Sequence, residues 1–345
     1  MRESYDSSNA KTAADAATVA SASKPRRNWG QYLNLLGPLA GLIVIFALFA
    51  VQAPESFLTS VNLETIARQT TIVGIAALGM TFVIISGGID LSAGAIIALA
   101  SVVVATLVKA GVAPVYAALG GVTAGAVCGL VNGALITRLR VVPFIVTLGT
   151  MLIVRGATKG IANEQTVNPD ADTWLNFLTA SLGPDQKWML VPPGVWLMLL
   201  LAMLVAGVLR YTRLGRHTFA IGSNEQTAQL CGVRVNRTKL LLYTLCAAFA
   251  GLAGVMQFSR LTLGDPTAAV GMELNVIAAV VIGGGSLSGG EGSVLGTLVG
   301  ALIMTVIDAG CSHLSLPNWV QEIATGTIIV LAVALDRLRR RRTTG

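Results

Sequence analysis

The chain has 345 residues and a formal net charge of +7, and 54% of its residues are hydrophobic while only 12% are charged. Soluble domains carry about 25% charged residues, so a soluble fold of this size would lack the charges that its surface needs. Intrinsic disorder is excluded too, because low hydrophobicity is its signature. The composition therefore predicts an all-α polytopic membrane protein.

The N-terminal region is polar up to the first apolar run. Residues 1–32 are predicted to form a disordered cytoplasmic tail, and residues 33–53 are the first apolar run. A basic flank and the segment Val51-Gln-Ala53 resemble a cleavable signal peptide. The run nevertheless has the roughly 20 apolar residues that a membrane span needs. We therefore expect a retained first helix.

Nine further apolar runs give about ten transmembrane helices in a permease domain over 33–336. The eighth run, at about 268–284, is the weakest, because it contains Glu273 and Asn275 and continues into Gly283-Gly-Gly285. We expect this segment to be a broken or re-entrant helix. The other predicted spans are 70–86, 91–108, 114–136, 144–162, 193–210, 240–259, 294–310 and 320–336.

The distribution of basic residues predicts the orientation. With a cytoplasmic N-terminus and ten crossings, 18 of the 24 Lys and Arg lie on the inside, and the basic tail 337–345 lies there too. Cytoplasmic loops of membrane proteins are enriched in Lys and Arg. We therefore expect a multi-pass protein of the bacterial inner membrane with both termini cytoplasmic. This orientation explains the positive net charge, so we predict no nucleic-acid partner.

The sequence carries no pattern of an enzyme or metal site. Four cysteines lack C-x-x-C spacing, and two histidines lie far apart without acidic or cysteine neighbours. The segment Leu287-Ser-Gly-Gly-Glu291 resembles an ABC ATPase signature, but that motif works beside a P-loop, which the sequence lacks. We predict no catalytic residue, metal site, bound cofactor or ATPase site in this chain. Its five tryptophans fall in loops or at predicted helix ends, as in an interfacial belt.

Two ladders of glycines repeat every four residues. This spacing places glycines on one helix face, where two backbones can approach closely. Tight internal packing and a sliding surface between gating helices are both compatible with it. The ladders are Gly121, Gly125, Gly129 and Gly133, and Gly292, Gly296 and Gly300.

The segment Ser86-Gly-Gly-Ile-Asp-Leu-Ser-Ala-Gly94 interrupts two apolar runs. An aspartate at the centre of a membrane helix costs about 2.5–3.5 kcal/mol on insertion scales, so Asp90 must be satisfied near an interface or in a cavity. It can cap the following helix or belong to a solute path or gate. The path candidates here are Gly87, Gly88, Asp90 and Ser92.

A second segment repeats this pattern. Residues 87–94 align without gaps on Gly283-Gly-Gly-Ser-Leu-Ser-Gly-Gly290, and five of the eight positions match. Broken helices in corresponding positions of two repeats are found near transporter solute sites. The path candidates in this segment are Gly284, Ser286 and Ser288.

The longest cytoplasmic loop, 210–239, contains a helix signal. Ser223 and Gln226 form a capping-box pattern, and Gly232 is placed to end the helix. A helix of about two turns is marginal alone, so it must lie on lipid headgroups or dock a cytoplasmic partner. The predicted docking residues are Ser223, Asn224, Glu225, Gln226, Thr227, Ala228 and Gly232.

These motifs together resemble the permease subunits of bacterial ABC importers for monosaccharides such as ribose, xylose, arabinose and galactosides, with the ribose type most similar. The resemblance covers about residues 33–338. It is carried by Gly79-Met-Thr81 before Gly87–Ser92, by Gly283–Gly290 with Gly296-Thr-Leu-Val-Gly-Ala301, and by Thr212-Arg-Leu-Gly-Arg216, Gly222-Ser-Asn-Glu225 and Cys231-Gly-Val233.

The resemblance implies three protein partners. A second permease copy encloses one path, a periplasmic binding protein delivers the sugar, and a cytoplasmic ABC ATPase uses ATP to drive the cycle. The family's coupling helix maps onto Ser223–Gly232. Family members usually carry two alanines after Asn-Glu, whereas this chain has Gln226-Thr227.

Other functions remain open from the sequence. A branched-chain amino-acid permease belongs to a related group, although the 87–92 segment and the length argue against it. An ion-coupled transporter would use acidic residues in mid-helix, and Glu273, Asp308 and Glu322 are the candidates. A membrane-embedded enzyme would need a paired catalytic constellation, which is not found. The sequence does not indicate which sugar is carried.

Overall fold

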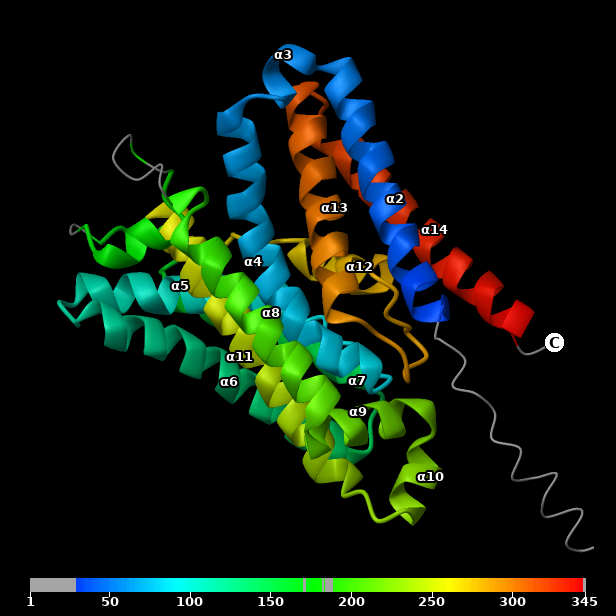
Figure 1. The fold of residues 1–345 in the computed structure, drawn as a ribbon. Coiled ribbons are helices and arrows are strands. Elements are labelled where there is room, and N and C mark those ends of the chain that lie inside the picture. Colours follow the sequence, from blue (N-terminus) through cyan, green and yellow to red (C-terminus); the bar gives the residue numbers. More distant parts are fainter. Residues whose placement is uncertain (1–28, 170–171, 182, 184–188, 344–345) are drawn as a thin grey trace, which may run out of the picture.

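The computed structural model describes residues 29–169, 172–181, 183 and 189–343, which form helices joined by loops and turns, without strands (Figure 1). Several helices begin with proline, whose missing N–H and fixed φ suit the first helical position. The elements are α2 (Trp29–Gln52), α3 (Pro54–Phe57), α4 (Ser60–Ile85), α5 (Ala93–Lys109), α6 (Pro114–Leu139), α7 (Pro143–Ile161), η1 (Trp174–Leu178), α8 (Pro193–Tyr211), α9 (Arg213–Ser223), α10 (Glu225–Leu230), α11 (Val235–Leu261), α12 (Met272–Ile282), α13 (Val294–His313) and α14 (Asn318–Thr343).

Every predicted span coincides with a helix, but the count of ten spans is not confirmed. Six of the described helices are long and apolar enough to cross a membrane, namely α4, α6, α7, α8, α11 and α13. The apolar parts of the other four are shorter: Leu36–Gln52, Ala93–Lys109, Met272–Ile282 and Trp319–Leu331. The fold is thus that of a polytopic membrane protein.

Helix α12 confirms that the eighth run is broken. Its 11 residues rise only about 16 Å at 1.5 Å per residue, roughly half of the ~30 Å hydrocarbon core. Gly271 before it and Gly284 after it both have positive φ, at 81° and 91°. This conformation is accessible to glycine without strain, so the chain turns sharply at both ends of α12.

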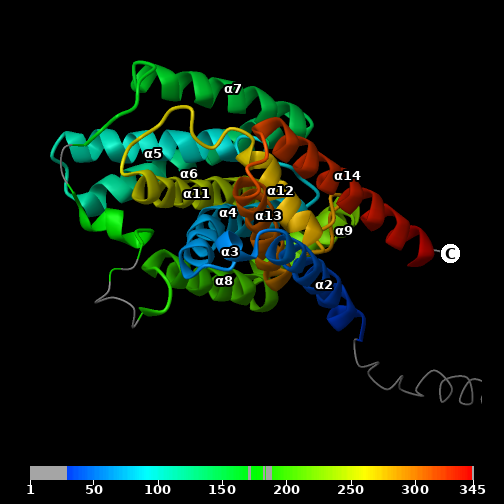
Figure 2. The same ribbon diagram turned by 90° about the horizontal axis from the view of Figure 1, so that it is seen from above.

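The core surrounds α4. In the most apolar window of α4, 89% of residues are buried, against 22% in α7 and 33% in α8. Seen from above, α7 and α8 lie at opposite edges of the molecule (Figure 2). Their outer faces carry exposed side chains such as Ile153 and Met203. Such apolar faces suit lipid.

The glycine ladders are packing surfaces, as one of the two interpretations predicted. A Cβ on Gly129 would lie 2.9 Å from the α-carbon of Thr244, and one on Gly300 would lie 3.0 Å from that of Ala279. The backbones of α6 and α11, and of α13 and α12, therefore touch. Gly292 is an exception, because it precedes α13 and lies against Ile85 instead.

The tail boundaries differ slightly from the prediction. Helix α2 begins at Trp29, so 29–32 are helical, and α14 continues through 337–343. Residues 1–28 lie outside the described part. Phe49 of α2 packs against Gly310 of α13, so the first run is part of the fold. The start of α2 and the end of α14 both lie toward the end of the bundle that carries α9 and α10, away from α3 (Figure 1).

Candidate functional site

The predicted docking segment folds as two helices, and its cap lies one residue later than expected. Helix α9 extends through Ser223, so Asn224 is the N-cap of α10 and its side chain accepts a hydrogen bond from Thr227 N at 2.8 Å. The Ser223–Gln226 capping box is therefore wrong. The prediction fails because α9 is held in place by the burial of Gly215, Thr218 and Ile221, and the helix therefore continues through Ser223. Asparagine caps as well as serine does.

The end of α10 agrees with the prediction. Gly232 has a φ of 85°, its N–H bonds to Gln229 O at 3.0 Å, and Val233 N bonds to Ala228 O at 3.0 Å. These two bonds form a Schellman motif, which satisfies carbonyls at a helix end. The short helix is thus closed by a specific structure at each end.

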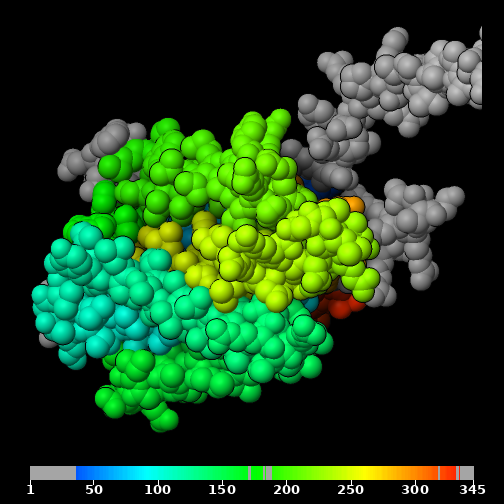
Figure 3. Space-filling model, turned by 90° about the horizontal axis from the view of Figure 1, so that it is seen from below, coloured from blue at the N-terminus to red at the C-terminus, as the bar shows by residue number. Residues whose placement is uncertain are grey.

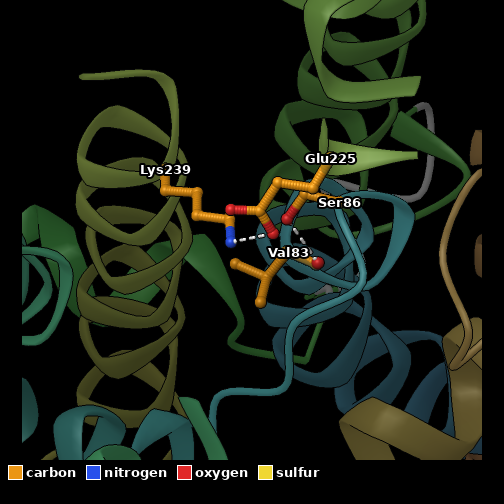
Figure 4. A network of polar contacts seen from close by, with 4 residues as sticks. All are labelled: Val83, Ser86, Glu225 and Lys239. Atoms are coloured by element: carbon orange, nitrogen blue, oxygen red, sulfur yellow. Dashed lines mark hydrogen bonds and ion pairs between the residues drawn. The ribbon is translucent and has the colours of Figure 1, made fainter. Parts of the chain in front are cut away.

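Helix α10 is anchored on one face and free on the other. Ala228 packs with Ile221 and Val235, and the Glu225 carboxylate accepts from Lys239 Nζ of α11 at 2.7 Å (Figure 4). In contrast, Leu230 is 88% exposed. Seen from below, the chain around α9 and α10 forms the centre of this face of the molecule (Figure 3).

The two glycine breaks share the same helix ending. Gly87 N and Gly88 N bond to Ile84 O and Val83 O, both at 2.9 Å. In the second segment, Gly284 N and Gly285 N bond to Val281 O at 3.0 Å and Val280 O at 2.8 Å. Both are Schellman motifs.

The two breaks also share a side-chain turn. Asp90 Oδ1 accepts from Ser92 N at 2.9 Å, and Ser286 Oγ accepts from Ser288 N at 3.2 Å. In the gapless sequence alignment, Asp90 pairs with Ser286, so the two turns correspond. The helix ends do not, because the alignment pairs Gly87 with Gly283, whereas the hydrogen bonds make Gly284 the structural equivalent of Gly87. Both segments therefore contain the same two local structures with one residue of difference in spacing.

The breaks meet each other and α9 in what we call the glycine junction, formed by 85–87, 222–223 and 289–290. Gly290 N donates to Ile85 O at 2.8 Å. A Cβ on Gly289 would lie 2.9 Å from the α-carbon of Gly222 and 3.0 Å from that of Gly87. Three distant segments thus touch through their backbones, which joins the predicted path segments to the predicted docking segment.

Asp90 lies in a fully buried polar cluster. Its Oδ1 also accepts from Ser92 Oγ at 2.5 Å, and Ser92 Oγ accepts from Asn132 Nδ2 at 2.9 Å. Among the described residues, Asp90 Oδ2 and Asn132 Oδ1 have no hydrogen-bond partner. The N-cap of α5 is Ser92, without a side-chain bond, so the helix cap predicted for Asp90 is not formed.

The seven predicted path residues lie outside the cavity of about 690 Å³. Ser286 and Ser92 are buried, and Gly87, Gly284 and Ser288 are exposed. The 690 Å³ cavity is instead lined by residues of α4, α12, α13 and α14 and by Arg260 at the end of α11. Its polar lining includes Asn62, Gln69, Arg260, Asn275, Asp308 and Glu322. The sequence signal for this cavity is the occurrence of Asn275, Asp308 and Glu322 within predicted membrane spans.

Inside this cavity, Asn275 Nδ2 donates to Asp308 Oδ2 at 3.3 Å. Glu273, the third acidic candidate, lies outside the cavity. Its carboxylate is 3.9 Å from Arg155 of α7 and packs against Gly94 in the first turn of α5. Within the described part of the chain, no group of three or more His, Cys, Asp or Glu could hold a metal ion.

Comparison with known proteins identifies the family. Residues 62–333 match the family model for the branched-chain amino acid transport system/permease component. The ribose import permease of Bacillus subtilis is 42% identical over 306 residues, which are 88% of this chain and 93% of that protein. The corresponding ribose permease of Escherichia coli K12 is 39% identical over 307 residues, again 88% and 93%.

A further relative is the L-arabinose ABC transporter permease of Azospirillum brasilense, 36% identical over 310 residues, which are 90% of this chain and 89% of that protein. No solved structure gives a significant match. The chain therefore belongs to the family of ABC-transporter permease components that includes these ribose and arabinose permeases.

Proposed function

We propose that this chain is the membrane-spanning permease subunit of an ABC importer for a monosaccharide. A periplasmic binding protein delivers the sugar, a separate cytoplasmic ATPase drives the cycle, and a second copy of the permease completes the path. The sugar is favoured over a branched-chain amino acid because the relatives at 36–42% identity are named for ribose and arabinose.

The strongest structural support for this proposal is the contact between α9 and both glycine breaks. A Cβ on Gly222 would meet Ile85 O and Gly290 N, so α9 touches the end of α4 and the loop before α13 without intervening side chains. Interiors are close-packed and transmit strain. A movement of α10, imposed by a docked ATPase, would therefore reach both breaks through α9.

The free face of α10 suits protein docking. Leu230 is 88% exposed, and a small cavity of about 290 Å³ nearby in the chain is lined by Glu225, Arg234 and Arg237. Apolar anchors within a charged rim are typical of protein interfaces. We assign this face to the ATPase rather than to lipid headgroups.

The orientation can be tested with a native cysteine. Cys231 is exposed at the end of α10, whereas Cys246 and Cys311 are buried. A membrane-impermeant maleimide is expected to label Cys231 in inside-out vesicles and to leave it unlabelled in right-side-out spheroplasts. The Cys231→Ser variant measures background labelling, including that of the partly buried Cys128. Stronger Cys231 labelling in spheroplasts would reverse the proposed orientation.

The docking role of α10 predicts the effect of a charge at Leu230. We expect Leu230→Asp to reduce co-purification of the ATPase and sugar uptake at least about tenfold, because truncating an interface anchor costs roughly 2 kcal/mol or more. Membrane insertion should be unchanged, since the side chain is exposed.

The matched control is Leu190→Asp. Leu190 is 82% exposed and precedes α8, at the end of that helix opposite α9. This variant should bind the ATPase like the wild type. Full ATPase binding and uptake by Leu230→Asp would contradict the assignment of α10.

A further inference from the structure

The cavity of about 690 Å³ is within the ~300–1,000 Å³ range of small-molecule sites. Two of its walls are α4 and α13, which are long enough to span the membrane. A third is the short helix α12, whose first turn reaches the cavity at Met272. Half-helices that begin within a membrane protein are a recurrent feature of transporter solute sites.

The polar groups of this cavity need a polar occupant. Asp308 is in α13 and Asn275 is in α12, and ionisable residues in membrane segments face a water-filled cavity or the protein interior rather than lipid. The cavity therefore holds water or a hydrophilic solute when the permease is in the membrane.

The Asp308–Asn275 pair presents a hydrogen-bond donor and hydrogen-bond acceptors side by side. After the 3.3 Å bond between them, the carboxylate keeps acceptor sites, and the amide keeps one N–H and its carbonyl oxygen. A hydroxyl group both donates and accepts, so two neighbouring hydroxyls of a sugar match this pair. An apolar amino-acid side chain would leave the same groups unpaired, at a cost.

Ring stacking does not contribute to this site. Among the described residues, the cavity lining contains no Trp, Tyr or Phe. The exposed Trp196 and Trp319 lie in the first turns of α8 and α14 instead. A site that binds by hydrogen bonds without ring stacking has a low affinity, which suits a transported solute that must be released.

We propose that Asp308 and Asn275 form a sugar subsite inside the permease that binds vicinal hydroxyl groups of a monosaccharide. This inference rests on the proposed function and extends it, because it makes the permease itself a selective element after the sugar is delivered.

The direct test measures binding to the permease alone. Wild-type protein in nanodiscs is titrated with D-ribose and its single-deoxy analogues by saturation-transfer NMR at millimolar concentrations. We expect Asp308→Asn and Asn275→Ala to weaken ribose binding at least about fivefold, and one or two deoxy analogues to bind the wild type about tenfold more weakly, as for loss of a hydrogen bond to a charged group.

The controls separate the site from general effects. Asp265→Asn removes a carboxylate that bonds Thr267 outside the cavity and should bind ribose like the wild type. If Asp308→Asn fails to fold, the analogue series on the wild type still decides. Equal binding of all deoxy analogues, or wild-type affinity in a folded Asn275→Ala protein, overturns the subsite.

The same variants are then measured in proteoliposomes with the binding protein and ATPase. We expect Asp308→Asn and Asn275→Ala to raise the KM for uptake, and Asp265→Asn to leave it unchanged. Normal uptake by both folded variants overturns the subsite while leaving the permease function intact. Absence of uptake of any monosaccharide by the wild-type importer would instead refute the proposed function.

Discussion

Replacing Gly222 by valine is expected to abolish sugar uptake while the permease still inserts and binds its ATPase. A side chain at this position would meet Ile85 O and Gly290 N, which are the two atoms of the 2.8 Å bond between the breaks. Both obstacles are backbone atoms, so the glycine junction must separate. We expect uptake to fall by at least about 100-fold, and stimulation of ATP hydrolysis by the sugar-loaded binding protein to be lost.

The control for this variant is Gly207→Val in α8. A Cβ at Gly207 meets no described atom within 4 Å, so this change tests valine in a membrane helix without the steric conflict. Melting temperature, ATPase co-purification and uptake are measured for both proteins. If Gly222→Val transported at the wild-type rate, direct contact through α9 would not be the route of coupling.

The sequence predicted the helices well because hydrophobic periodicity and length are local signals. Each apolar run became a helix, and the weak eighth run became α12, half the length of a span. The prediction at Ser223 failed by one residue because the cap position depends on where α9 ends. That end is fixed by burial of Ile221, a tertiary effect that overrides a local motif.

The site could not be predicted in the same way, because it is built from long-range contacts. The junction joins Ile85, Gly222 and Gly290, and no local pattern pairs three segments so far apart. Both glycine motifs and the docking segment were recognised separately, but their contact became visible only in the fold. The cavity likewise combines side chains from five helices, whereas the sequence motifs placed the path at the glycine segments themselves.

Asp90 illustrates what a motif leaves undetermined. Its turn with Ser92 is local, but Asn132 of α6, whose amide bonds Ser92 Oγ, comes from a distant part of the chain. A buried acceptor without a donor costs about 1–3 kcal/mol. We therefore expect this cost to disfavour the present state relative to one in which Asp90 Oδ2 gains a donor or water.

We therefore expect that replacing Asp90 by asparagine lowers sugar uptake without lowering the stability of the permease. Asparagine keeps one oxygen for the bonds from Ser92 N and Oγ, and its amide can donate to the unpartnered Asn132 Oδ1. We expect a melting temperature equal to or above that of the wild type, because the neutral amide avoids the cost of burying a charge without a cationic partner. Uptake should fall about tenfold, since 1.4 kcal/mol of lost bias changes a population ratio tenfold.

Two further variants define the structural baseline. Asp90→Ser reproduces the second break, where Ser286 forms the same turn with Ser288, so it should fold and should also transport poorly. Ser101→Ala removes a buried hydroxyl that bonds only to Ala98 O and should transport normally. If Asp90→Asn and Asp90→Ser both transported at the wild-type rate, Asp90 would serve only to form its turn, and the charge would have no part in the cycle.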